Sequence, residues 1–306
     1  RQRQMCIRDR GYTMHHAISQ DKQGNILATV SKTSAKIANG KDVRINDFII
    51  MMDPEKGEIL QEWDLVHMLD SARYGMTDYD LTSDPFAQSA SNWAHNNGIV
   101  EWGDDYLATA RYQGIFKFNK AGGIEWIISP HGYWRDKYLK LLLNPLHADG
   151  TPITDPEVIA GTKTCDDFEW PWGCHTAVPL PNGHILYFNN GYGRNFKLDF
   201  TDRKNIYTCG IEYEVDEVNR TVRQVWQYGK ERGAAYFTPA RSGVQYLEQT
   251  GNRLICPGMS NVLSNGNRGA RVTEVDPETQ DVVFELELED AIYQRVYRMS
   301  LYPENQ

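Results

Sequence analysis

Short apolar segments separated by polar turns recur along the chain, and this pattern predicts β-strands rather than helices. Four segments begin with a distinctive residue, continue as an apolar strand and a glycine-containing turn, and reach a leucine eleven or twelve residues later. Their turns QGN, NGH and TGN, flanked by apolar residues, are typical of β-hairpins. The four segments are residues 16–27, 95–107, 175–186 and 243–254.

A second hairpin follows each of these segments. Its first strand ends in an Asp or Asn that can bond the backbone amides of a turn, and its last strand carries an aromatic residue suited to packing between repeats. The turn residues are Asp53, Asn119, Asp216 and Asp276, and the aromatic residues are Trp63, Trp126, Trp226 and Phe284.

Four antiparallel strands per repeat predict an all-β fold, a β-propeller with about four blades in this chain. We expect residues 11–306 to form one partial propeller that is a piece of a larger one, because residues 296–303 resemble the opening of another strand. We exclude residues 1–10 as a non-native or disordered tail. The expected blades are residues 16–65, 95–128, 175–228 and 243–288.

Two long connections separate the repeats, at residues 66–94 and 129–174. Connections of this length between compact units are often functional lids. The second contains the only helix that we predict, at residues 136–143, where apolar residues have helical spacing.

Charge and composition exclude several classes of partner. The 306 residues carry a formal net charge of −9 without a long basic run, so we expect neither nucleic acid nor an anionic membrane as partner. No apolar stretch is long enough for a membrane span. The chain lacks GxGxxG, Walker, HExxH and GxSxG motifs, and we expect no cofactor.

The cysteines leave two interpretations open. No CxxC occurs, which argues against a cysteine-rich zinc site. Cys165 and Cys174 are either disulfide-bonded, in an oxidising compartment, or free thiols.

The first residue of each repeat carries the chemistry. The inner strands of a propeller line a central channel, so residues at equivalent strand starts converge there. Three of these four positions are histidine, namely His16, His95 and His175, and the fourth is Gly243. We expect a functional histidine cluster, and the alternative is channel-lining histidines hydrated by water.

Two arginines follow the inner hairpins. We expect Arg111 and Arg194 to reach the same channel mouth, where a guanidinium could bind a sulfate- or phosphate-like group bidentately. The alternative is that both are surface arginines in salt bridges.

The other histidines carry weaker expectations. Because adjacent strand residues face opposite ways, only one of His15 and His16 should enter the channel. We expect His67, His131, His147 and His184 to be ordinary surface histidines. A three-histidine metal site remains a rival for the axial cluster, although nearby paired carboxylates are missing from the sequence pattern.

From about Gly11 to the end, the chain resembles the bacterial aryl-sulfate sulfotransferases that work independently of 3′-phosphoadenylyl sulfate. The resemblance rests on HHAI, NWAHNNGIVEW, FEWPWGCHTAVPLPNGHILYFNNGYGRN, VWQYGKERG and SGVQYLEQTGNRLICPG, together with the connection from PHGYW to NPLHADGTPI. It implies a six-bladed propeller with an N-terminal β domain, located in the periplasm or secreted.

The resemblance also implies a reaction, sulfuryl transfer from a phenolic sulfate ester to a phenol through a sulfated histidine. By motif, the catalytic residues are His95, His175 and Arg194, and we assign substrate binding to His16, Arg111, Asn97 and Thr176. We assign no metal ligand, and the sequence predicts no oligomeric state.

One departure from the family pattern affects the nucleophile. In the family the nucleophilic histidine lies downstream of the equivalent of Arg194, whereas this chain has no histidine after His184. The role therefore passes to His95 or His175, or the protein is catalytically altered. The alternative functions are a non-catalytic propeller that binds a sulfated or phenolic ligand or a partner protein, and a metal-dependent hydrolase.

Overall fold

Four sheets make up most of the structure, a computed structural model that describes residues 11–39, 42–73, 93–198, 205–260 and 262–290. The first sheet has the order β1 (Tyr12–Gln20), β2 (Ile26–Asn39), β3 (Asp42–Met52) and β4 (Ile59–Asp64). The second has the order β5 (Asn96–Trp102), β6 (Asp105–Ala110), β7 (Gly114–Phe118) and β8 (Ile124–Ile128).

The third sheet differs by a fifth strand at its outer edge. Its order is β10 (His175–Pro179), β11 (Ile185–Asn189), β12 (Cys209–Asp216), β13 (Thr221–Tyr228) and β9 (Asn144–Leu146), and only β9 pairs in parallel. The fourth sheet has the order β14 (Gly243–Tyr246), β15 (Arg253–Cys256), β16 (Gly269–Val275) and β17 (Val282–Glu289). The all-β prediction is confirmed, and the expected repeats overlap these sheets.

The polar turns form as their residues predict. The Asp53 carboxylate accepts hydrogen bonds from the amides of Glu55 and Lys56, at 2.8 and 3.0 Å. The side chains of Asn119, Asp216 and Asp276 accept turn amides in the same way. Each turn replaces lost strand pairing with side-chain acceptors, which fixes the second hairpin of every repeat.

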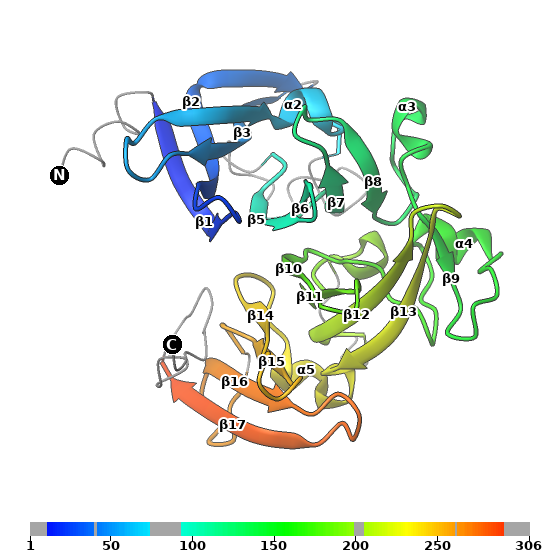
Figure 1. Cartoon of the computed structure of the whole chain (residues 1–306). Helices are drawn as coiled ribbons and strands as arrows, with labels where there is room; N and C mark the ends of the chain where they lie inside the picture. The colour runs from blue at the N-terminus through cyan, green and yellow to red at the C-terminus, as the bar shows by residue number, and fades with distance from the viewer. Residues whose placement is uncertain (1–10, 40–41, 74–92, 199–204, 261, 291–306) are drawn as a thin grey trace.

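The sheets follow one another around an arc, with the first strand of each facing the shared centre (Figure 1). Polar bonds join these inner strands. The Ser19 hydroxyl on β1 donates to the Ile99 carbonyl on β5 at 2.7 Å, and the Asn97 amide on β5 donates to the Cys174 carbonyl before β10 at 2.8 Å. Residues distant in sequence therefore meet at the centre.

Aromatic residues on the outer strands pack between neighbouring sheets, as predicted for three of the four. The Trp63 ring lies 4.8 Å from the Tyr106 ring, and its indole N–H donates to the Lys120 carbonyl in the turn between β7 and β8. Trp126 and Trp226 are also buried. Phe284 is 50% exposed on β17, and no sheet follows β17 among the described residues, so the packing role expected for it stays a prediction.

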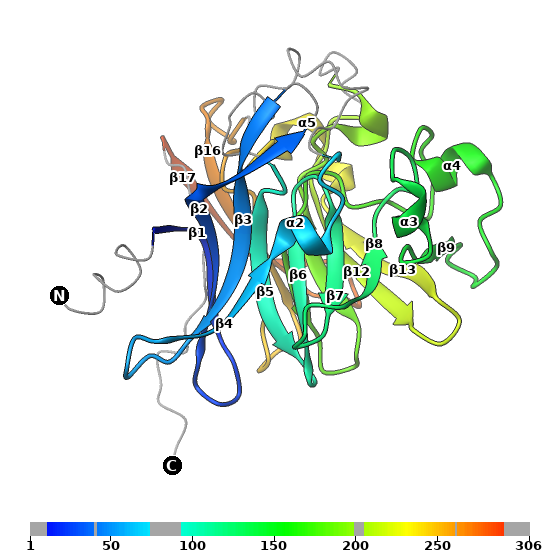
Figure 2. The same ribbon diagram turned by 90° about the horizontal axis from the view of Figure 1, so that it is seen from above.

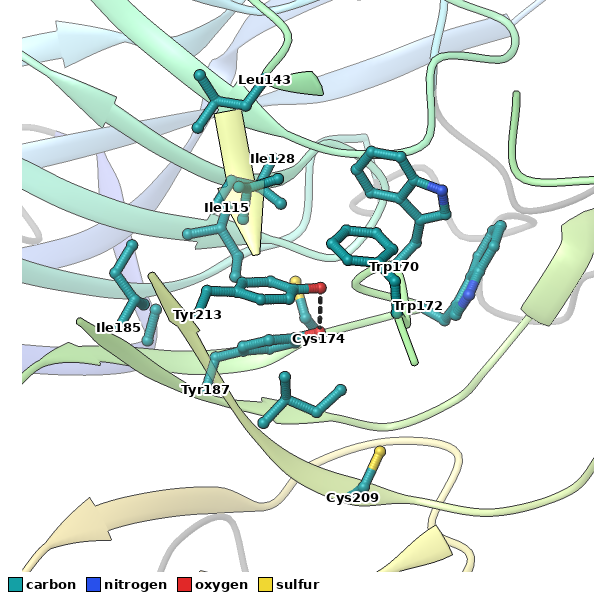
Figure 3. Packing of buried hydrophobic residues seen from close by; sticks show 14 of the residues in the cluster. Ile115, Ile128, Leu143, Trp170, Trp172, Cys174, Ile185, Tyr187, Cys209 and Tyr213 are labelled. Atoms are coloured by element: carbon teal, nitrogen blue, oxygen red, sulfur yellow. Dashed lines mark hydrogen bonds between the residues drawn. The ribbon is translucent and has the colours of Figure 1, made fainter. Parts of the chain in front are cut away.

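A large hydrophobic core lies between the second and third sheets (Figure 3). Tyr187 and Tyr213 stack there with their hydroxyls 2.8 Å apart, because buried phenols need hydrogen-bond partners. Trp170 and Trp172, from the connection before β10, close the same cluster. This packing holds the segment that leads to His175.

The helix prediction for the second connection needs correction. Of residues 136–143, only α3 (Asp136–Leu139) is helical, because Leu141 and Leu143 pair with Ile127 of β8 by backbone hydrogen bonds of 2.8 and 3.0 Å. Figure 2 shows α3, α4 and β9 together beside the outer strands β8 and β13. Other short helices also form: α2 (Leu65–Met68), α4 (Pro156–Ala160), α5 (Gly233–Tyr236), η1 (Arg194–Phe196) and η2 (Lys230–Arg232).

Cys165 and Cys174 are both free thiols, so the structure selects this interpretation over the disulfide. Among the described residues, no helix has the length and apolar character that crossing a bilayer requires. The predicted tail at residues 1–10, most of the first connection (residues 74–92) and the strand expected at residues 296–303 lie outside the described residues.

Candidate active site

Three histidines meet at the centre of the arc, where the sequence pattern places them. The ring of His16 lies 4.6 Å from that of His95 and 6.1 Å from that of His175, and the rings of His95 and His175 are 6.4 Å apart. One nitrogen from each ring lies within 4.8 Å of the others. The predicted convergence of repeat positions is therefore confirmed for these residues.

A local irregularity of the inner strands accompanies each histidine. His16 and His95 have φ of 54°, and Thr176, directly after His175, has φ of 48°. The strand register shifts at each place, as in a β-bulge. Such a conformation costs about 1–3 kcal/mol in a residue other than glycine and re-aims neighbouring side chains. All three strands share this strain beside the cluster, a pattern typical of a functional site.

His15 and His16 depart from strand alternation because of this bulge. Their Nδ1 atoms lie 3.0 Å apart, so the prediction that adjacent side chains point to opposite faces is wrong here. His15 Nε2 also lies 3.5 Å from the carboxylate of Asp47, a side chain only 2% exposed. The same carboxylate accepts the backbone amide of His95 at 2.8 Å. Asp47 thus positions one histidine by its backbone and pairs with another.

The tautomer of His175 follows from the hydrogen bonds of Asn190. The Asn190 amide N–H₂ donates to the carbonyls of Thr238 and Arg241 at 3.0 and 3.2 Å, which turns its oxygen toward His175. His175 Nδ1 lies 2.6 Å from that oxygen and 3.2 Å from the Gly173 carbonyl. Two acceptors require Nδ1 to carry the proton, and the lone pair therefore resides on Nε2.

The cluster keeps its buried histidines neutral. Burial lowers the pKa of His95 well below 6.5, and the nearby His16 and Arg111 lower it further. Burial and the Arg111 charge likewise lower the pKa of His175 well below 6.5. Neutral imidazoles at physiological pH can act as nucleophiles or bind a metal ion.

The two predicted arginines occupy different environments. Arg111 is buried beside the histidines, where its charge acts on both, and its guanidinium stacks 4.3 Å from the centre of the Tyr192 ring. Its Nη2 donates to the Pro239 carbonyl at 2.8 Å. The structure thus brings Arg111 to the cluster, and the alternative of a surface arginine in a salt bridge does not fit it.

Arg194 lies in a buried ion pair. Its Nε donates to Glu169 at 2.6 Å, and its Nη1 and Nη2 donate to the carbonyls of Asn205 and Tyr207, at 2.8 and 3.4 Å. The guanidinium stacks 3.6 Å from the Tyr207 ring centre. All three nitrogens are engaged by protein oxygens, so the prediction that this arginine points to the channel mouth does not describe this structure.

Asn97 and Thr176 are buried within the walls of the site. Asn97 accepts from the Thr109 hydroxyl at 2.6 Å and donates to the Cys174 carbonyl, so its amide joins the strand of His95 to the segment before His175. Both ends of the Asn97 amide are thus hydrogen-bonded within the protein, which gives this residue a positioning role.

The remaining histidines only partly match the surface prediction. His67 is 82% exposed. The other three are half-buried and bonded: His131 to the Leu143 carbonyl, His147 to Asp167 and His184 to Glu212.

Sequence reasoning missed Asp47, Glu169 and Asn190. Their roles depend on partners far away in the chain, so no local motif marks them. Asn190 lies in the NNG segment of a motif that resembles the family. Its hydrogen bond to His175, however, depends on the pairing of β10 with β11, which the motif does not indicate.

Comparison with known proteins gives the family of the chain. The model of the arylsulfotransferase (ASST) family matches residues 6–298. Relatives include the arylsulfate sulfotransferases AssT of Escherichia coli O6:H1 and Lelliottia amnigena, which are 28% and 29% identical over 316 residues. Each alignment covers 94% of this chain and 52% of the relative, so the chain spans about half the length of these relatives.

Two solved structures resemble the chain weakly. A candidate 6-phosphogluconolactonase from Bacteroides uniformis has a TM-score of 0.40 at 11% identity, covering 94% of this chain and 77% of that chain. The extracellular domain of a candidate hybrid two-component system from B. thetaiotaomicron has a TM-score of 0.32 at 13% identity, covering 90% and 30%. With its family model matched along nearly the whole sequence, the chain belongs to the arylsulfotransferase family.

Proposed function

We propose that this protein transfers a sulfuryl group from a phenolic sulfate ester to a phenol, and that His175 carries the group between them. The observation that carries the proposal is the fixed tautomer of His175, which leaves the Nε2 lone pair facing away from its Asn190 anchor. Family membership and the arylsulfate sulfotransferase relatives support the reaction class.

The first half-reaction follows from this geometry. The Nε2 lone pair of His175 attacks sulfur, an N–S bond forms, and the S–O bond to the aryl group breaks to release phenolate. The positive charge of Arg111 acts on His175 and stabilises the negative charge of the sulfuryl group during the transfer. His16, the exposed histidine of the three, protonates the departing phenolate as general acid and is left neutral, whereas His95 stays neutral throughout because burial lowers its pKa.

The second half-reaction reverses the roles. The same histidine takes the proton of the acceptor phenol, whose oxygen attacks sulfur as the N–S bond breaks. His175 is thereby regenerated with its lone pair, and no 3′-phosphoadenylyl sulfate takes part. His15 lies between His16 and the buried carboxylate of Asp47, which gives this base an electrostatic partner.

Release of a coloured phenol tests the proposal. The full-length protein is incubated with 4-nitrophenyl sulfate and a phenol acceptor, and nitrophenol release is followed with time. We expect His175→Ala to lower the rate by about 10³-fold or more, since it removes the nucleophile. His67→Ala, at an exposed histidine, is the matched control. Equal rates for the His175 variant and the wild type would rule out the assignment.

A metal-dependent hydrolase is the second candidate, because one nitrogen from each of His16, His95 and His175 lies within 4.8 Å of the others. Three imidazoles with an open position form a catalytic zinc set. This candidate predicts stoichiometric zinc by elemental analysis and loss of activity with a chelator. A non-catalytic propeller would instead show ligand-induced thermal stabilisation without turnover.

We also propose that the four sheets are consecutive blades of a six-bladed β-propeller, in a protein of the periplasm or a secreted one. The arc of sheets in Figure 1 and the hydrogen bonds between inner strands support the blade arrangement. The family resemblance supports the compartment. Cell fractionation of a producing organism tests it, and recovery with cytoplasmic markers would contradict it.

A further inference from the structure

A second group of metal-ligating side chains lies in the connection between the second and third sheets. His147 directly follows β9, while Cys165 and Asp167 come from the segment that leads to β10. His147 Nδ1 lies 3.0 Å from Asp167 Oδ1, and Cys165 Sγ lies 3.1 Å from the same oxygen. One ligand atom of each residue lies within 4.8 Å of the other two.

The geometry points to a site for a zinc-class divalent cation, held by His147, Cys165 and Asp167. Zinc takes imidazole, thiolate and carboxylate ligands at about 2.0–2.3 Å in a tetrahedral arrangement, so its ligand atoms stand about 3.3–3.7 Å apart. The observed contacts need to open by only about half an ångström. The thiolate and imidazole together favour zinc over magnesium or calcium.

Hydrogen bonds already orient the ligands for such an ion. The Ala148 amide donates to Asp167 Oδ2 at 2.9 Å and so holds the carboxylate beside His147, whose Nδ1 lies 3.0 Å from Oδ1 and 3.2 Å from Oδ2. The amide of His147 donates to the Thr151 carbonyl at 2.8 Å, closing a turn behind the imidazole. Second contacts of this kind fix ligand orientation in metal sites.

The surroundings anchor both ends of the site and leave one side open. The strand before His147 pairs in parallel with β13, and Cys165 packs against the core of Figure 3. The side chains of His147 and Asp167 are 39% and 37% exposed, so a water molecule can supply the fourth ligand. Deprotonated Cys165 and Asp167 carry two negative charges, which balance one divalent cation.

A bound ion would join the two ends of a connection about twenty residues long. Asp167 lies eight residues before His175, and Trp170 and Trp172 between them are core residues. We therefore assign the site a structural role, holding the segment that delivers the candidate nucleophile. This assignment rests on the observed triad and does not depend on the proposed sulfuryl transfer.

Cobalt substitution tests the site with a readout other than activity. The full-length protein is stripped with a chelator and titrated with CoCl₂, then with ZnCl₂. We expect one equivalent of cobalt to produce a thiolate-to-cobalt charge-transfer band and tetrahedral ligand-field bands, and zinc to displace both. The histidine cluster at the centre lacks a thiolate, so the charge-transfer band reports only a sulfur-containing site.

Cys165→Ser should abolish the charge-transfer band, and Cys174→Ser is the matched control because it makes the same change in the same connection. Asp167→Asn keeps the acceptor for the Ala148 amide, and we expect it to weaken cobalt binding by at least about 10-fold. Circular dichroism confirms folding of each variant. No charge-transfer band in the wild type, or a band that survives Cys165→Ser, would overturn the proposal.

Discussion

The hydrogen bond between Asn190 and His175 affects the pH below which the rate of the reaction falls. In Asn190→Asp, a carboxylate would face His175 Nδ1 in place of the neutral amide oxygen. A nearby negative charge favours imidazolium and raises the pKa of His175. We expect the rate of nitrophenol release to fall at a higher pH than in the wild type, measured as a pH–rate profile. Asn182→Asp, at a hairpin turn, is the control, and coincident profiles for Asn190→Asp and the wild type would contradict the tautomer argument.

Burial of His95 and His175 also predicts how stability depends on pH. The pKa values of both histidines in the folded protein lie below the ordinary value of 6.5. Below pH 6.5 the unfolded chain therefore binds protons at these histidines that the folded protein does not bind. Stability is therefore complete above about pH 6.5 and is lost progressively as the pH falls toward the folded pKa values. We expect the Tm between pH 7 and pH 5 to fall less in His175→Gln than in the wild type. An equal fall in both proteins would refute this contribution.

Variants of Arg194 test whether this arginine has a structural or a catalytic role. Removing one partner of a buried ion pair leaves an uncompensated charge, so Arg194→Ala should lower the free energy of unfolding by about 3–5 kcal/mol. The double variant Arg194→Met with Glu169→Leu removes both charges and should restore most of that stability. If Arg194 acts only through the fold, the double variant also recovers activity. Restored stability without restored activity would show that its guanidinium takes part in the reaction.

At the scale of elements, the outer aromatic residues decide how the sheets pack. Trp63 contacts Tyr106 and Phe118 of the second sheet, and its removal leaves a cavity between sheets. We expect Trp63→Ala to cost about 3–5 kcal/mol by denaturant unfolding. Phe284→Ala makes the same type of change at the equivalent position of the fourth sheet, where the ring is 50% exposed, and should cost much less. Similar costs for both would contradict the inter-sheet role.

The elements were readable from the sequence where local chemistry decides them. Asp53 and its equivalents bond their own turns, so the second hairpins could be located from a few residues. The helix expected at residues 136–143 failed because Leu141 and Leu143 pair with β8, a partner that apolar spacing does not reveal. The bulges at His16 and His95 place residues other than glycine at positive φ, for which the sequence offers no signal.

At the scale of the whole molecule, repetition carried the prediction of the site. Equivalent positions of three repeats predicted that His16, His95 and His175 would meet, and they do. The position of Arg194 could not be predicted in the same way, because Glu169, which pairs with it, precedes the predicted blade, and Tyr207, on which it stacks, lies between the two hairpins. Repeats thus predict convergence at a shared centre, while the direction of each side chain depends on individual long-range partners.

In the proposed reaction, His175 Nε2 is the atom that carries the sulfuryl group. The full-length protein is mixed with 4-nitrophenyl sulfate without acceptor, quenched under alkaline conditions, digested and mapped by mass spectrometry. We expect a sulfuryl adduct on the peptide that contains His175, lost when a phenol is added before quenching and absent in His175→Ala. Turnover without that adduct, or an adduct confined to another residue, would contradict transfer through His175.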